Sequence, residues 1–224
     1  MPAADSKDVA DRAIGVPFAK EGFPFIGAAA GITLIAWWLG WVPVAVVGAM
    51  VTLFVSWFFR NPPRRVPQGP GLVVAPGDGV VLAVEEEFEP RYLKDRAVRI
   101  SIFLNVFDVH INRIPCEGIV ENVQYQPGLF LVASKPHATV KNEQNAVMIK
   151  TMEGAKVLCV QVAGLIARRI VCWVNPKDQA VRGERYGLIR FGSRMDTYLP
   201  VGTTIRIAVG NRVTGGETIL GELQ

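Results

Sequence analysis

Residues that build metal centres or disulfide frameworks are rare in this sequence. It has three cysteines, Cys116, Cys159 and Cys172, and two histidines, His110 and His137. The cysteines are odd in number and lack the paired short spacing of a zinc site, which favours ordinary buried thiols in a reducing compartment. We therefore expect neither a disulfide scaffold nor a bound metal ion.

Charge is also scarce. Charged residues make up 20% of the 224 residues, hydrophobic residues make up 50%, and the formal net charge is +4; soluble domains carry roughly 25% charged residues. Lysine and arginine are spread along the chain and form no patch interleaved with aromatic residues, which argues against a nucleic-acid partner. The composition favours membrane contact and one globular domain whose core needs no disulfides.

The longest segment without charged residues runs from Gly22 to Phe59 and contains no Asp, Glu, Lys or Arg. About 20 apolar residues cross a bilayer core, so this segment has room for one long helix or for two short ones. Trp41-Val42-Pro43 divides it near the middle and favours a helical hairpin. Basic residues outside both ends predict that both ends lie on the cytoplasmic side of a cell membrane; they are Lys20, Arg60, Arg64 and Arg65.

Two other interpretations of this segment are weaker. A secretory signal is disfavoured because acidic residues precede the segment and no cleavage site follows a short apolar region. A buried helical pair is the second alternative, although 38 uncharged residues are long for a soluble hairpin. We therefore expect an N-terminal segment at 1–21, with a short amphipathic helix, a membrane anchor at 22–60 and a separate domain at 61–224.

The character of the sequence changes after residue 61. A Pro and Arg cluster at 61–65 should end the helix, and short β-branched segments separated by Gly, Pro and Asn follow. This pattern predicts a mainly β domain, a compact sandwich or barrel. The strands that we expect are Leu72–Ala75, Val80–Glu85, Ala97–Val109, Gly118–Tyr125, Ala146–Thr151, Lys156–Val162, Ile170–Val174 and Thr203–Val209.

The segment 98–115 places polar residues at the end of an apolar strand face. Strand alternation puts its apolar residues from Val98 to Val106 on one face, and Asp108, His110 and Asn112 continue that face. A partly buried imidazole there could act as a general acid or base. The alternative is a hydrogen-bonded histidine without a chemical role, and the residues alone do not decide between the two.

Three further segments have the chemistry of turns. Asp78 stands between two glycines in APGDGVV (75–81), and Gly192-Ser193, within 185–200, lies between an apolar strand and another short strand; each is explained by a plain turn when taken alone. GNRVTGGETILGEL (210–223), read beside APGDGVV, resembles the half-motifs of lipoyl and biotinyl carrier domains. A carrier needs a modifiable lysine, which neither segment contains.

Taken in order, seven segments resemble the short form of the phosphatidylserine decarboxylase proenzymes, and the resemblance covers essentially the whole chain. The segments are FFRNPPRR (58–65), APGDG (75–79), NVFDVHINRIPCEG (105–118), KNEQNAV (141–147), QVAGLIARRIV (161–171), GLIRFGSRMD (187–196) and GNRVTGGETIL (210–220).

The resemblance implies that the chain makes its own cofactor. Ser193 would attack the carbonyl of Gly192, the chain would break between 192 and 193 into a β chain (1–192) and an α chain (193–224), and residue 193 would become a pyruvoyl group. That group would form a Schiff base with the seryl amine and accept the electrons released with carbon dioxide. Glycine before the serine allows the strained turn that such an attack needs.

The resemblance also assigns roles to other residues. Asp78 and His110 would assist Ser193 as a carboxylate, imidazole and hydroxyl set, and His110 would supply a proton during decarboxylation. Longer members carry two histidines three residues apart, whereas Arg113 holds the second position here, so one histidine could serve both steps. Arg113 and Arg194 are candidates for binding the lipid phosphate, because guanidinium groups bind phosphate oxygens in a bidentate way.

Other functions fit parts of the sequence. The substrate could be another seryl lipid, such as archaetidylserine, since the head group is the same. A membrane-tethered, carrier-like module without enzyme activity is the third hypothesis. For the enzyme we expect a phospholipid substrate, a membrane partner, α and β chains that stay associated, no nucleic acid, and a subunit that could form a homo-oligomer.

Overall fold

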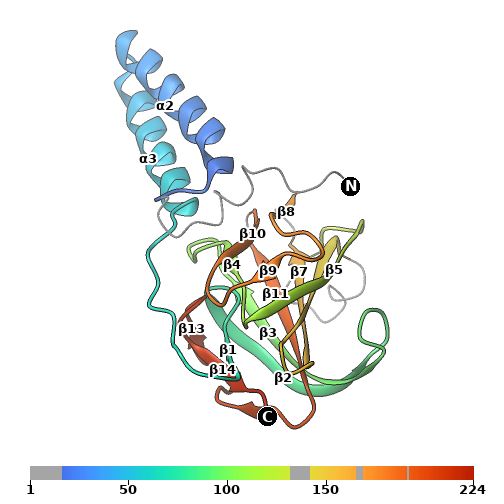
Figure 1. Cartoon of the computed structure of the whole chain (residues 1–224). Helices are drawn as coiled ribbons and strands as arrows, with labels where there is room; N and C mark the ends of the chain where they lie inside the picture. Colours follow the sequence, from blue (N-terminus) through green and yellow to red (C-terminus); the bar gives the residue numbers. More distant parts are fainter. Residues whose placement is uncertain (1–16, 132–141, 165–168, 191) are drawn as a thin grey trace. The chain divides into compact units, whose positions relative to one another are not determined.

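The computed structural model describes residues 17–131, 142–164, 169–190 and 192–224. The chain divides into a helical unit, Gly15–Pro63, and a second unit that contains Arg64–Gln224. Figure 1 shows that strands dominate the second unit, here called the β unit. The amphipathic helix expected near the N-terminus lies almost entirely outside the described residues.

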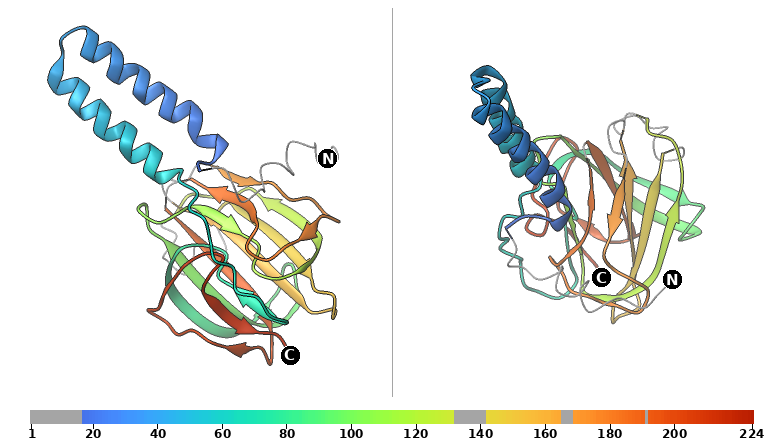
Figure 2. Two further views of the ribbon diagram at one scale, coloured as in Figure 1. Left: turned by 60° about the vertical axis from the view of Figure 1, so that its left-hand side comes forward. Right: turned by 90° about the horizontal axis from the view of Figure 1, so that it is seen from above.

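The helical unit consists of the 3-10 turn η1 (Lys20–Gly22) and the helices α2 (Phe23–Trp38) and α3 (Val42–Phe58). A proline in the first turn starts each helix, where the missing N–H costs nothing. The two helices run antiparallel, side by side (Figure 2). Their closest approach is at Gly48, where an added Cβ would lie 2.5 Å from Thr33 Oγ1.

Most large apolar side chains of α2 and α3 are exposed, among them Trp38 at 83% and Leu53 at 71%. The break between the helices falls at Trp41, where the sequence divides the uncharged segment. No helix in the described part of the chain has the length and apolar character needed to cross a membrane. Anchoring by this unit stays a prediction.

The β unit contains one large and two small antiparallel sheets. The large sheet has eight strands in the order β13-β2-β3-β11-β7-β6-β5-β9, and the small sheets have the orders β1-β14-β12 and β4-β10-β8. This confirms the predicted mainly β fold. The strands are β1 (Leu72–Val74), β2 (Gly79–Glu89), β3 (Asp95–Leu104), β4 (Ile111–Arg113), β5 (Gly118–Gln126), β6 (Gln144–Lys150), β7 (Lys156–Ala163), β8 (Ile170–Cys172), β9 (Gln179–Ala180), β10 (Arg185–Ile189), β11 (Ser193–Pro200), β12 (Thr204–Ile205), β13 (Arg212–Val213) and β14 (Ile219–Glu222).

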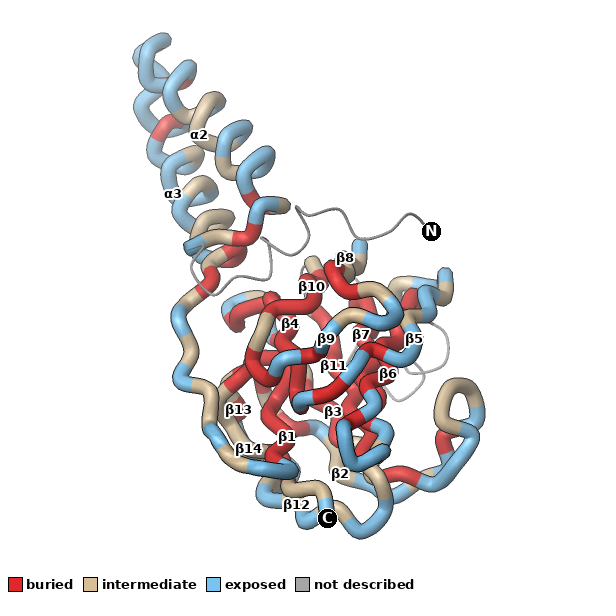
Figure 3. The backbone as a smooth tube through the Cα atoms, viewed as in Figure 1, coloured by how far each residue is buried: buried red, intermediate tan, exposed pale blue. Residues whose placement is uncertain are grey.

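The core follows from side-chain alternation along the central strands. Ile100, Ile102 and Leu104 of β3 point to the same face and are fully buried, as the sequence pattern predicted. They belong to the main hydrophobic cluster, and a smaller cluster packs on the other face of the large sheet. Figure 3 shows that β11, at the centre of this sheet, is buried along almost its whole length.

The strand predictions differ from the structure at three points. The expected strand Ala97–Val109 ends at Leu104, because a turn closed by the Asp108 N–H and the Asn105 carbonyl oxygen, 2.8 Å apart, follows it. The expected strand Thr203–Val209 is reduced to β12. The short strand expected after Gly192-Ser193 is present as β11 and runs to Pro200, whereas the short strands β4, β9, β13 and β14 were not expected.

Candidate active site

The Gly192-Ser193 peptide lies where β11 begins. Gly192 has φ +63°, a left-handed conformation that favours glycine. Ser193 is hydrogen-bonded into the large sheet, opposite Leu104 of β3 on one side and Ala163 of β7 on the other. Its side chain is fully buried, and within the described residues Ser193 Oγ has no hydrogen-bond partner. A buried hydroxyl without a partner, at a strand end and next to a glycine in the left-handed conformation, is an unusual arrangement for a structural serine.

The imidazole of His110 lies beside this peptide. The Gly192 N–H donates to His110 Nε2 over 3.2 Å, and His110 Nδ1 lies 3.0 Å from the carbonyl oxygen of Asp108. A carbonyl can only accept, so the proton is on Nδ1, and the lone pair of Nε2 accepts the Gly192 N–H. The sequence-predicted pair of His110 and the Gly192-Ser193 peptide therefore meets in the structure.

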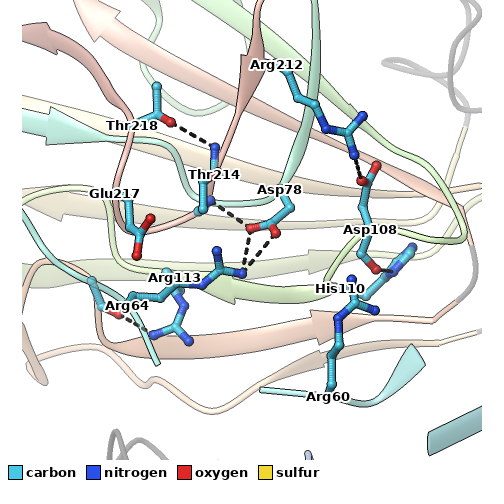
Figure 4. A network of polar contacts seen from close by, with 12 residues as sticks. Arg60, Arg64, Asp78, Asp108, His110, Arg113, Arg212, Thr214, Glu217 and Thr218 are labelled. Carbon is cyan, nitrogen blue, oxygen red and sulfur yellow. Dashed lines mark hydrogen bonds and ion pairs between the residues drawn. The ribbon is translucent and has the colours of Figure 1, made fainter. Parts of the chain in front are cut away.

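The turn before β4 fixes the position of His110. Asp108 Oδ2 accepts the Asn105 N–H over 2.8 Å, while Asp108 Oδ1 pairs with Arg212. These contacts hold the Asp108 carbonyl that His110 Nδ1 binds, as Figure 4 shows. The sequence placed Asp108 on the same face as His110 but did not reveal that its backbone oxygen orients the imidazole.

Asp78 has other partners. Arg64 Nη2 lies 3.0 and 2.9 Å from its two carboxylate oxygens, and the Gly215 N–H donates to Oδ1 over 2.8 Å. Among the described residues, no hydrogen bond joins Asp78 to His110. Gly79 is required for close approach, since an added Cβ would lie 2.1 Å from the Phe103 carbonyl oxygen. Arg64 is a partner that sequence reasoning missed; its only signal was its place in the matched segment 58–65.

The two candidate phosphate-binding arginines occupy different surroundings. Arg113 is buried, and its Nη1 donates to the Gly183 carbonyl over 2.9 Å. Burial, followed by the positive charges of Arg64 and Arg185, lowers the pKa of Arg113 to about 10. Its reduced basicity marks a position where a further anion would be favourable.

Arg194 follows Ser193 on β11 and therefore points to the opposite face of the sheet. Its Nη2 lies 2.8 Å from Asp196 Oδ2, and both side chains are almost completely buried. Such an ion pair already neutralises Arg194, which weighs against phosphate binding. His137, the other histidine, lies outside the described residues.

Comparison with known proteins finds one family over most of the chain. The family model described as phosphatidylserine decarboxylase matches residues 51–221. A protein named phosphatidylserine decarboxylase proenzyme from Syntrophus aciditrophicus is 47% identical over 204 residues, which cover 91% of this chain and 96% of that protein. Proteins of the same name from Nitrosomonas europaea and Geotalea uraniireducens are each 48% identical, over 91% and 92% of this chain and 94% and 97% of their own lengths.

Proposed function

The chain belongs to the phosphatidylserine decarboxylase family, and we propose that it matures by cutting itself before Ser193 and then works through a pyruvoyl group at that position. The family makes it a lyase that converts phosphatidylserine into phosphatidylethanolamine and carbon dioxide. The observation that supports the proposed site best is the 3.2 Å contact of His110 Nε2 with Gly192, next to the buried Ser193 hydroxyl.

The surroundings of residue 193 fit a group made from the chain itself. Cleavage before Ser193 would turn the first residue of β11 into a chain end, while its ladder partners Leu104 and Ala163 keep it in place. Strands β11 and β14 belong to the segment 193–224. Strand β11 lies between β3 and β7, and β14 pairs with β1, and these three partner strands belong to the segment 1–192. These sheet contacts support a processed enzyme in which the chains 1–192 and 193–224 stay associated.

Self-cleavage can be written on the residues present. Ser193 Oγ attacks the carbonyl carbon of Gly192 and loses its proton to a base, and the C–N bond breaks as the Ser193 nitrogen takes up a proton, which leaves an ester and a free amine. Loss of the Cα proton of residue 193 then expels the Gly192 carboxylate and leaves a dehydroalanine. Water releases its nitrogen as ammonia and leaves a ketone.

His110 is the proposed base and the proposed proton donor. The Nδ1–H bond to Asp108 leaves the lone pair on Nε2, at the residue whose carbonyl is attacked. The pyruvoyl ketone, once made, supplies an electron sink for decarboxylation. His110 would then return a proton to the α-carbon of the product. One imidazole in contact with Gly192 supports a single histidine serving both stages.

The remaining site residues have supporting roles in this proposal. Asp78, bound to Arg64 and Gly215, holds two distant segments together close to Arg113. We assign Asp78 to self-cleavage through this positioning and Arg113 to the lipid phosphate. Arg194 stays a second phosphate candidate, with its ion pair to Asp196 against it.

Membrane association is a further part of the proposal. The exposed apolar side chains of α2 and α3 and the uncharged segment from Gly22 to Phe59 support contact with a bilayer. Arg60 stacks on Trp57, 4.0 Å from the ring centroid, a pairing suited to an interface. We place the β unit on the cytoplasmic side of the cell membrane. Flotation with phosphatidylserine vesicles tests the contact, and light scattering of detergent-purified protein tests for a homo-oligomer.

Intact-mass measurement of the denatured protein tests the proposed self-cleavage. Cleavage before Ser193 releases residues 193–224, about one seventh of the 24.5 kDa chain, with a first residue that reacts with carbonyl reagents and gives no amine. A single unmodified mass together with absent decarboxylase activity would contradict the proposal. Release of carbon dioxide from carboxyl-labelled phosphatidylserine by the processed protein would support it.

A further inference from the structure

A chain of buried amides crosses the interior of the β unit beside the site. Asn145 Nδ2 donates to Gln161 Oε1 over 2.9 Å, and Gln161 Nε2 donates to Asn112 Oδ1 over 2.7 Å. The three side chains come from β6, β7 and β4, and each is at most 3% exposed. Side-chain amides are seldom buried in such a row unless their hydrogen bonds orient one another and make the interior rigid.

The orientation of the amide groups in this row, with the oxygen and the nitrogen of each assigned, is fixed by its contacts. Gln161 Nε2 also lies 3.4 Å from the carbonyl oxygen of Val171, which can only accept, so the nitrogen of Gln161 must face Val171 and Asn112. Asn112 then offers its oxygen to Gln161 and turns its NH2 group away. Within the described part of the chain, Asn112 Nδ2 has no hydrogen-bond partner, although Asn112 is fully buried.

The Asn112 NH2 group lies near two residues that neighbour Ser193, Leu104 and Met195. It is 3.6 Å from where a Cβ of Gly77 would stand, and the same point is 3.2 Å from Leu104 Cδ2 and 3.5 Å from Met195 Cγ. Leu104 is the ladder partner of Ser193, and Met195 points to the same face as Ser193. Asn112 also follows His110 by two residues and shares its side of the chain. The donor therefore faces the interior that holds both groups of the proposed chemistry.

We propose that Asn112 Nδ2 is a hydrogen-bond donor reserved for the oxygen that becomes negatively charged when Ser193 attacks Gly192, and that Gln161, itself oriented by the Val171 carbonyl, holds it in that orientation. The inference rests on the proposed function. A buried donor without a partner is unfavourable in the resting protein. It becomes favourable when an anionic oxygen forms nearby, because a preorganised donor needs no rearrangement at that moment.

Leucine substitutions separate this role from a structural one. Replacing both partners of the Gln161–Asn112 hydrogen bond by apolar groups is nearly neutral for stability, but the change also removes the acceptor of Asn145 Nδ2. Asn112→Leu/Gln161→Leu should therefore melt close to Asn145→Leu, which loses that second bond too, while its self-cleavage slows about 100-fold. The matched control is Asn145→Leu, which removes the far end of the row but leaves Asn112 Nδ2 in place. It should cleave at the wild-type rate.

A second variant decides the question if the leucine variants are unstable. Asn112→Asp keeps the shape; its neutral acid form can donate a hydrogen bond, whereas its ionised form cannot. Its cleavage rate relative to wild type should therefore fall as the pH rises, which a purely structural role would not produce.

The outcomes are distinguishable. Wild-type cleavage rates in the stable double variant, or a ratio for Asn112→Asp that does not change with pH, would overturn the role of Asn112 alone. A wild-type chain that never cleaves would overturn the proposed function itself. Both rates are measured by intact mass on freshly refolded or newly translated full-length chain.

Discussion

Alternate residues of β11 face two buried environments that are built in opposite ways. Ser193 faces the interior of the β unit together with His110 and Asn112, where the polar groups are neutral and, within the described residues, Ser193 Oγ and Asn112 Nδ2 have no partner. Arg194 and Asp196 face the other side, where two full charges pair at 2.8 Å. One strand thus carries neutral polar groups on one face and an ion pair on the other.

The two faces of β11 should therefore serve different purposes: the Ser193 face supports the reaction, and the Arg194 face supports the stability of the fold. A buried neutral group without a partner costs about 1–3 kcal/mol and stays available to a reacting group. A buried ion pair adds little net stability, but removing one partner costs about 3–5 kcal/mol, because the other charge is left uncompensated. Substitutions on the Ser193 face should therefore change rates with little effect on folding, and substitutions on the Arg194 face should do the reverse.

The largest effect is expected for Ser193→Ala. Without the hydroxyl there is no attacking oxygen, so the chain should stay whole and inactive while it folds normally. Intact mass and urea unfolding measure the two properties. Ser101→Ala is the matched control, because Ser101 is a buried serine on β3 opposite Asp196, on the ion-paired face. Two fragments from Ser193→Ala would show that another residue supplies the nucleophile.

His110→Ala should slow self-cleavage by a factor of about 10²–10⁴, the range for a lost general base. The imidazole contacts Gly192 directly, so the loss should exceed that in any variant of the ion-paired face. A time course of intact mass after synthesis measures it. His137→Ala changes the other histidine and should cleave normally. Equal slowing in both variants would contradict the role of His110 as the general base.

Asp196→Ala tests the opposite face. It leaves Arg194 buried without its carboxylate, so the free energy of unfolding should fall by about 3–5 kcal/mol, while the folded fraction still cleaves itself. Urea unfolding at neutral pH measures the loss. Arg194→Met/Asp196→Leu should recover most of it, since both charges are removed together. A raised KM for phosphatidylserine in that double variant, at unchanged stability, would instead make Arg194 a phosphate ligand and would blur the separation of the two faces.

The same comparison explains what the sequence could predict. The alternation of Ile100, Ile102 and Leu104 was enough to place the interior face of β3, because a strand with one buried face repeats every two residues. A short strand was expected after Gly192-Ser193 as well, but the sequence did not reveal that Arg194 and Asp196 are buried inside the sheet as a pair. Burial of paired charges is a tertiary property that local patterns do not reveal.

Some features of the candidate site were predicted from the sequence, and others were not. Ser193 and His110 were predicted, from the family resemblance and from a polar cluster at a strand end, and the structure brings His110 to the Gly192-Ser193 peptide. The partners of Asp78 and Asp108 were not, because Gly215 and Arg212 lie more than a hundred residues away along the chain. Contacts of that separation depend on how the sheets stack, which a single sequence does not state.

The smallest effect concerns the thiols packed against the Ser193 face. Burial raises the pKa of Cys116 from 9.0 to about 12 and raises that of Cys159 as well. Between pH 9 and pH 10 the unfolded chain therefore releases thiol protons that the folded chain keeps, and stability must fall as the pH rises. Each thiol should contribute about 1 kcal/mol to the loss over this interval.

Arg113 offsets part of this loss, because its lowered pKa of about 10 acts in the opposite direction, but its contribution is the same in wild type and in a cysteine variant and cancels when the two are compared. Urea unfolding of wild type and Cys116→Ala at pH 8, 9 and 10 measures the slope, and the variant should show the weaker pH dependence. Cys172→Ala is the control, since Cys172 is only partly buried. An identical slope in wild type and Cys116→Ala would mean that water reaches this thiol, and the interior beside Ser193 would then be less dry than the chemistry proposed for it requires.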